Sequence, residues 1–166
     1  MNLARLVASF LGVGFCPVAP GTAGSLAALG LGVPLLFLSP WALPIAILLA
    51  CVLGVWAVER AAGGAADPGW VVIDEVAGQW VAMLPLAPLG LSFETAASFE
   101  TMGGLAASFA LFRLFDIVKP GPVGWADRRH DAIGVMADDL IAGAMAAAML
   151  WAMLGAMLWF WPVLHG

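Results

Sequence analysis

The chain has 166 residues, of which 63% are hydrophobic and only 10% are charged. Soluble domains are about 45–50% apolar, so this composition excludes an ordinary soluble protein and indicates an integral membrane protein. The formal net charge of −5 does not identify a partner, because in a membrane protein the placement of charges matters more than their sum. The sequence contains no linker or internal repeat, and we expect one membrane-embedded domain over residues 1–166 with no nucleic-acid partner.

The first predicted element is a short apolar run, Leu3 to Val13, with Arg5 near its start. It is similar to the hydrophobic part of a signal peptide, but it is too short to span a bilayer and no small-residue cleavage site follows it. We therefore expect a short N-terminal helix that stays attached and lies in the membrane interface.

The segment GFCPVAPGTAGS follows this helix. Gly21 and Gly24 permit a close approach of the backbone, and Thr22 or Ser25 can cap the next helix, whose N-terminal amides would attract a phosphate. A purely structural turn that opens a helix is the simpler interpretation of this segment taken alone.

Five longer apolar segments come next, and a helix needs about 20 apolar residues to cross the hydrocarbon. They cover residues 23–38, 41–62, 71–91, 96–118 and 134–163. The period-2 alternation of a β-strand is missing. The third and fourth segments are also compatible with re-entrant helices. We therefore predict an all-α polytopic membrane bundle with four or five spanning helices.

Tracing the chain back and forth across the membrane brings its polar motifs to one side. The six basic residues of the chain all fall on that side: Arg5, Arg60, Arg113, Lys119, Arg128 and Arg129. The other side carries Glu94 and Glu100 but no basic residue. Because basic residues collect on the cytoplasmic side of membrane proteins, we predict that the polar motifs face the cytoplasm.

Acidic residues lie near three helix ends on this predicted face. They are Asp74 with Glu75, Asp116, and Asp138 with Asp139. A carboxylate at the centre of a membrane helix costs roughly 2.5–3.5 kcal/mol, less near the ends, and such residues usually face a partner or a cavity. Acids that converge from several helices repel one another unless a cation lies among them, and oxygen ligands suit Mg²⁺. The alternative is that the paired acids only complement helix dipoles in the first turn.

The stretch FRLFDIVKP adds positive charge. It places Arg113, Asp116 and Lys119 at i, i+3 and i+6, so that Asp116 neighbours both cations, and Pro120 is expected to end the helix. Arginine suits bidentate phosphate binding, and cations beside a metal site favour an anionic substrate. The alternative is an interfacial ion-pair ladder. We interpret His130, in the following charged loop, as a solvated residue rather than a catalyst.

Signatures of several other phosphatase mechanisms are missing from the sequence. Neither cysteine is followed six positions later by arginine, and no Asp-x-Asp occurs. What remains is metal-assisted chemistry on a phosphate at the membrane surface. A small ion-coupled transporter is the alternative from another class, because intramembrane carboxylates also mark ion pathways. Relay carboxylates would be spread through the bilayer, whereas here they collect at one interface.

Four stretches in order, GVGFCPVAPGTAGS, VVIDEVAG, FRLFDIVKPGP and GVMADDLIAG, resemble the phosphatidylglycerophosphatase A family over residues 12–143. The resemblance implies a Mg²⁺-dependent phosphatase of the bacterial inner membrane. Such an enzyme removes the terminal phosphate from phosphatidylglycerophosphate and leaves phosphatidylglycerol.

Site residues follow from the positions that match the family. We expect metal-ligating or catalytic roles for five acids: Asp74, Glu75, Asp116, Asp138 and Asp139. We expect substrate binding by Thr22, Ser25, Arg113 and Lys119. The resemblance does not assign individual roles to these residues, and both direct attack by water and a phospho-aspartyl intermediate are compatible with them.

Overall fold

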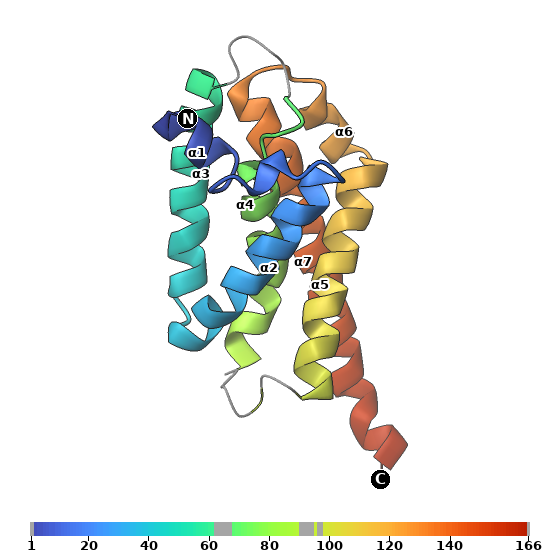
Figure 1. Cartoon of the computed structure of the whole chain (residues 1–166). Helices are drawn as coiled ribbons and strands as arrows, with labels where there is room; N and C mark the ends of the chain where they lie inside the picture. The colour runs from blue at the N-terminus through green and yellow to red at the C-terminus, as the bar shows by residue number, and fades with distance from the viewer. Residues whose placement is uncertain (1, 62–67, 90–94, 96–97, 166) are drawn as a thin grey trace.

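The computed structural model describes residues 2–61, 68–89, 95 and 98–165, and these residues form helices and turns without a strand. Figure 1 shows the arrangement. The α-helices are α1 (Leu3–Ala8), α2 (Pro20–Leu38), α3 (Ala42–Ala61), α4 (Ile73–Met83), α5 (Phe99–Val118), α6 (Pro122–Asp127) and α7 (Ala132–His165). Two 3₁₀ segments, η1 (Val13–Phe15) and η2 (Leu84–Leu89), precede α2 and continue α4.

Four of these helices are long and apolar enough to cross a membrane. The qualifying stretches are Pro20–Leu38, Ala42–Ala61, Glu100–Val118 and Ala132–Met157. The prediction of an all-α polytopic membrane bundle is therefore confirmed, with four spanning helices in the described part of the chain.

The third predicted segment does not form a membrane-length helix. Its α-helical part, α4, has 11 residues and continues into η2, which contains Pro85 and Pro88. Proline has no amide proton to donate to the preceding turn, so the regular α-helix ends before these residues.

Helix α4 lies at the centre of the bundle. Most of its residues are buried, and it packs against α2, α3, α5 and α7. Its apolar side chains therefore meet protein rather than lipid on every side. This position shields the polar residues that α4 carries.

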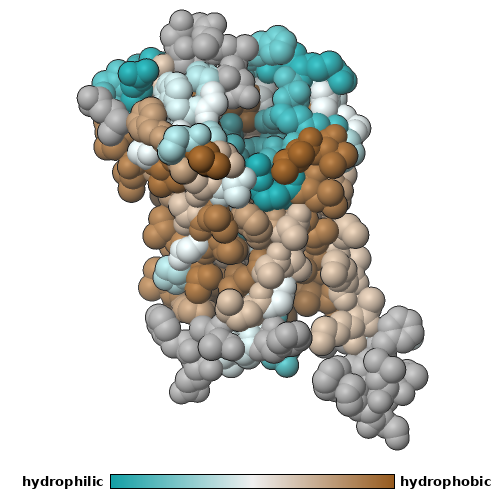
Figure 2. All heavy atoms as spheres, turned by 45° about the vertical axis from the view of Figure 1, so that its right-hand side comes forward, coloured by the Kyte–Doolittle hydropathy of each residue, from teal (hydrophilic) through white to brown (hydrophobic). Residues whose placement is uncertain are grey.

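The polar motifs meet at one end of the bundle, as predicted. In Figure 1, α2, α4 and α7 run downward from that end, whereas α3 and α5 run upward to it. Helix α6 and the N-terminal helix α1, which packs on α3, lie there too. Figure 2 shows hydrophilic surface gathered at this end, above a belt of hydrophobic surface.

Candidate active site

Two glycines let α4 and α7 approach closely beneath the polar end. A Cβ atom added to Gly78 would lie 2.5 Å from the carbonyl oxygen of Asp139, and one added to Gly143 would lie 3.0 Å from the carbonyl carbon of Gly78. Gly78 follows Asp74 by four residues, as Gly143 follows Asp139, and residues four apart share one face of a helix. The glycine contact therefore brings the two aspartates together one turn above it.

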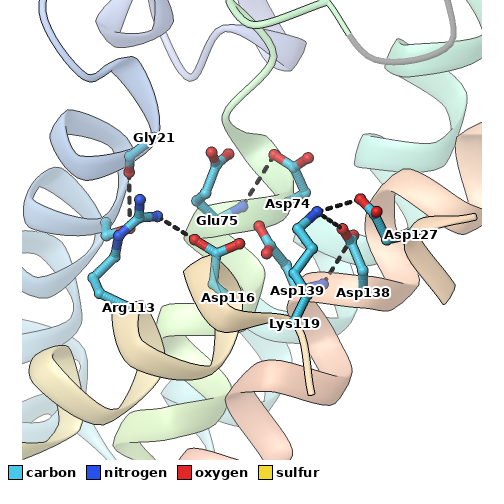
Figure 3. A network of polar contacts seen from close by, with 10 residues as sticks. Gly21, Asp74, Glu75, Arg113, Asp116, Lys119, Asp127, Asp138 and Asp139 are labelled. Atoms are coloured by element: carbon cyan, nitrogen blue, oxygen red, sulfur yellow. Dashed lines mark hydrogen bonds and ion pairs between the residues drawn. The ribbon is translucent and has the colours of Figure 1, made fainter. Parts of the chain in front are cut away.

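The acidic cluster consists of Asp74 and Glu75 of α4 and Asp139 of α7 (Figure 3). One carboxylate oxygen from each residue lies within 4.8 Å of the others. Asp74 is 7% exposed and Asp139 is 4% exposed, while Oε2 of Glu75 is buried without a hydrogen-bond partner among the described residues. Carboxylates this close repel one another strongly away from water, so the acidic cluster is suited to hold a cation.

Asp138 points away from the acidic cluster. Its Oδ1 accepts a hydrogen bond from the backbone N–H of Asp139 at 3.0 Å, and its Oδ2 lies 2.9 Å from Nζ of Lys119. Adjacent helical residues point about 100° apart, which explains why Asp139 joins the cluster and Asp138 does not.

Helix α7 begins earlier than its sequence suggested. It starts at Ala132, and the first turn contains no acid. The interpretation of Asp138 and Asp139 as first-turn complements of the helix dipole is therefore wrong, whereas Asp74 and Glu75 do lie in the first turn of α4.

Lys119 makes different contacts from those predicted. It pairs with Asp138 and with Asp127 of α6, rather than with Asp116. Helix α5 ends at Val118, just before Pro120 as predicted, and Lys119 adopts a left-handed φ of 48° that takes it out of the helical register. Burial acts to lower the pKa of the Lys119 ammonium, but the hydrogen bonds to Asp127 and Asp138 outweigh burial and raise the pKa, so the group stays charged.

Asp127 is a site residue that the sequence analysis did not select. It ends the short helix α6, which folds back over the polar end after Pro120 and Gly121. Asp127 reaches Lys119 only because the chain reverses here. In the sequence Asp127 was one acid among several charged residues, and nothing distinguished it as a site residue.

Arg113 and Asp116 form the predicted ion pair, with Nη1 of Arg113 2.6 Å from Oδ2 of Asp116. Nη1 of Arg113 is occupied by this ion pair, whereas Nε is buried without a hydrogen-bond partner among the described residues. The ion pair therefore balances the charge of Arg113 and holds its guanidinium near Gly21 and Glu75. Asp116 also lies beside Asp139, but it is not one of the three acids in the acidic cluster.

The predicted hydroxyl caps of α2 are wrong. Helix α2 starts at Pro20, before Thr22 and Ser25, and its N-cap is Ala19, which makes no side-chain capping bond. Ser25 is fully buried, and its hydroxyl donates to the carbonyl of Gly21 at 2.8 Å.

Gly21 is the residue of α2 that touches the site. A Cβ atom at this position would overlap Oε1 of Glu75 and lie 3.4 Å from Nη1 of Arg113. The predicted close approach of the backbone is thus present at Gly21, where it seats α2 against both α4 and α5.

A small polar pocket connects the site to the outside. Asp74 and Asp138 form its inner wall, and Asp127, Arg129 and His130 form part of its outer wall. His130 is exposed, as expected for a solvated residue, yet it borders this pocket.

The outer wall of the pocket is fixed at the start of α7. Asp131 accepts a hydrogen bond from the backbone N–H of Gly134 at 2.7 Å and pairs with Arg129 at 2.8 Å. The Arg129 side chain, followed by the Gly134 amide, lowers the pKa of the Asp131 carboxyl.

The fold and the site define a polytopic helical membrane protein with a cluster of three acids beside two basic side chains at one end of the bundle. Comparison with known sequences identifies the family. Residues 6–154 match the family described as Phosphatidylglycerophosphatase A, and the chain belongs to that family. The resemblance seen in the sequence is confirmed.

Three relatives span most of the chain. Phosphatidylglycerophosphatase A of Escherichia coli (strain K12) is 35% identical over 151 residues, which are 89% of this chain and 81% of the relative. Phosphatidylglycerophosphatase A of Haemophilus influenzae is 32% identical over 92% of this chain and 89% of the relative. A putative phosphatidylinositol-3-phosphatase of Bacteroides thetaiotaomicron is 34% identical over 87% of this chain and 89% of the relative.

All three relatives carry the names of phosphatases, and nothing in the comparisons favours a transporter. No solved structure is significantly similar to the chain.

Proposed function

We propose that this protein hydrolyses the terminal phosphate monoester of phosphatidylglycerophosphate to give phosphatidylglycerol and phosphate. The observation that carries the proposal is the acidic cluster of α4 and α7, which lies beside Arg113 and Lys119 at one end of a membrane bundle. Membership of the phosphatidylglycerophosphatase A family, and the names of the Escherichia and Haemophilus relatives, point to this substrate.

Mg²⁺ is the cofactor in this proposal. Asp74, Glu75 and Asp139 would hold the ion, since they offer a buried set of oxygen donors within 4.8 Å of one another. The unpartnered Oε2 of Glu75 supports this fit. When bound, Mg²⁺ would supply Lewis-acid polarisation of the phosphoryl group and a lowered pKa of bound water. Asp116 and Asp138 stand next to the cluster as further ligands or as groups that orient water.

Arg113 and Lys119 bind the phosphoryl oxygens. The planar guanidinium of arginine suits donation to two oxygens of a tetrahedral phosphate, and charge stabilisation by fixed cations is the main contribution that a protein makes to phosphoryl transfer. Thr22, in the first turn of α2, adds a hydroxyl near helix N-terminal amides. Ser25 serves the site indirectly, through its bond to Gly21.

Asp138 is the carboxylate best placed to accept a proton from the attacking water. It borders the polar pocket together with Asp74, and it lies outside the cluster that would hold the ion. A phospho-aspartyl route would use one of the same acids as the nucleophile, and acid-quench trapping of phosphorylated protein distinguishes the two routes.

The active site faces the cytoplasm of a bacterial inner membrane in this proposal. All six basic residues belong to the end of the bundle that carries the site, and the far end has none. The substrate would therefore reach the site from the cytoplasmic leaflet.

The test is release of free phosphate by purified protein in detergent micelles. We expect release from phosphatidylglycerophosphate with Mg²⁺, loss of release with EDTA, and loss in Asp139→Asn. Glu59→Gln, which changes an exposed acid of α3 outside the cluster, is the matched control and keeps normal activity. No release from this substrate refutes the proposal. Release only from phosphatidylinositol 3-phosphate would move the activity to the substrate in the name of the Bacteroides relative.

A further inference from the structure

Gln79 is a fully buried carboxamide on α4, below the acidic cluster. Its Nε2 donates to Oγ of Ser108 on α5 at 3.4 Å, and the Ser108 hydroxyl donates in turn to the carbonyl of Leu105 at 2.8 Å. Because the Ser108 proton is already used, Ser108 acts as an acceptor toward Gln79. This arrangement assigns the NH₂ group of Gln79 to the Ser108 side and leaves Oε1 pointing elsewhere.

Gln79 lies one helical turn below Glu75. Side chains four residues apart on a helix have Cβ atoms about 5–6 Å apart, and long helical side chains lean toward the N-terminal turn. The carboxamide of Gln79 therefore leans toward the turn of α4 that carries Glu75. Helix α5 runs antiparallel to α4 and carries Ser108 at the level of Gln79, with Arg113 higher, near Glu75 and Gly21.

Three buried side-chain atoms in this part of the described chain have neither a hydrogen-bond nor an ion-pair partner. Two are acceptors, Oε2 of Glu75 and Oε1 of Gln79, and one is a donor, Nε of Arg113. An unpaired buried polar group costs about 1–3 kcal/mol. A water molecule donates two hydrogen bonds and accepts two, and buried waters typically make about three bonds to such groups.

We propose that Gln79 is a positioning residue for Glu75, acting through a buried water that donates to both side chains and accepts from Arg113. The bridge holds the Glu75 carboxylate in one orientation, and so sets the affinity of the acidic cluster for its metal ion. This inference rests on the metal site of the proposed function. The simpler possibility is that Gln79 and Ser108 only join α4 to α5.

The affinity for Mn²⁺, a paramagnetic substitute for Mg²⁺, separates these two roles. It is measured by electron paramagnetic resonance on the purified protein in detergent, without reference to turnover. Gln79→Met keeps the length of the side chain and removes both polar atoms. We expect it to weaken Mn²⁺ binding roughly tenfold or more, the range found for residues that orient metal ligands.

Two further variants complete the test. Ser108→Ala removes the group that orients the carboxamide, and we expect a smaller loss of Mn²⁺ affinity. Trp80→Phe is the matched control, because Trp80 is a buried neighbour on α4 whose indole N–H donates to the carbonyl of Ala28 at 2.8 Å. It should lower the melting temperature and leave Mn²⁺ affinity within about twofold, since its bond lies outside the site.

The outcomes are distinguishable. Unchanged Mn²⁺ affinity in Gln79→Met overturns the inference and leaves the proposed phosphatase activity standing. If Trp80→Phe loses as much Mn²⁺ affinity as Gln79→Met, the loss comes from disturbed packing of α4, and the inference is also overturned. If Gln79→Met does not fold, unchanged affinity in Ser108→Ala overturns it instead. If the wild-type protein binds no Mn²⁺ although it releases phosphate, the metal site fails, and this inference fails with it.

Discussion

Gly143→Ala places a single methyl group at the contact between α4 and α7. The added Cβ would overlap the carbonyl oxygen of Gly78 and lie 3.0 Å from its carbonyl carbon and 3.1 Å from its Cα. Carbon atoms in favourable contact are about 3.5–4.0 Å apart. The overlap with the carbonyl oxygen is the largest, because C···O contacts are ordinarily about 3.3–3.6 Å, so the two helices must separate by roughly 1 Å or more to admit the methyl group.

This separation lowers both stability and activity, but by unequal amounts. Overpacking in a core costs about 1–3 kcal/mol, whereas alanine is better than glycine in a helix by about 1 kcal/mol. The free energy of unfolding should therefore fall by at most about 2 kcal/mol. Asp139 lies one turn from the contact, and a displacement of about 1 Å at reacting groups can reduce the rate about 100-fold. We expect activity to fall far more than stability.

Phosphate release and thermal unfolding of the purified variant test this expectation together. Gly155→Ala is the matched control on the same helix, because a Cβ there meets nothing within 4 Å. It should keep full activity and stability. If Gly143→Ala retains wild-type turnover, the glycine contact does not set the geometry of the acidic cluster, and the reasoning fails.

Three other predictions address metal binding, phosphate binding and orientation. Asp74→Asn and Asp139→Asn should each lower turnover about 100-fold or more at low Mg²⁺. High Mg²⁺ should restore part of the turnover if the main defect is weaker metal binding. Unchanged turnover would exclude these two residues as ligands. Arg113→Lys keeps the charge but loses the planar donors, so we expect about a 10- to 100-fold loss that added Mg²⁺ does not repair. Single cysteines at Arg128, directly after α6, and at Trp41, directly before α3, are exposed and should react from opposite sides of the membrane in a background without native cysteines. Reaction of the Arg128 position from outside intact cells would invert the proposed orientation.

Hydropathy was sufficient to predict the spanning helices but not helix α4. The long helices each present one side to lipid, so their sequences are apolar throughout. Helix α4 is equally apolar because other helices surround it, and composition alone does not distinguish lipid from protein as the neighbour. The stronger indication was the pair Pro85 and Pro88, which end its α-helical part within 11 residues.

The sequence was sufficient to predict which site residues lie at the same face of the membrane. Membrane topology restricts each helix end to one of two sides, so the three groups of acids could be placed together without knowing any packing. The partners of Lys119 were not predictable in this way. Lys119 follows Asp116 by three residues, and this spacing brings the two side chains into contact only if the helix continues through Lys119. The left-handed conformation of Lys119 instead directs its side chain to Asp127 and Asp138.

The spacing of acid and glycine explains how two helices can hold mutually repelling carboxylates. Asp74 precedes Gly78 on α4, and Asp139 precedes Gly143 on α7, by the same four residues. Both helices run away from the polar end, and helical side chains lean toward the N-terminus, so both carboxylates rise from the glycine contact toward that end. Repulsion between them would push the helices apart at this level, while the packing below holds them together. A bound cation would remove the repulsion, so the proposed metal binding and the crossing of α4 and α7 would stabilise each other.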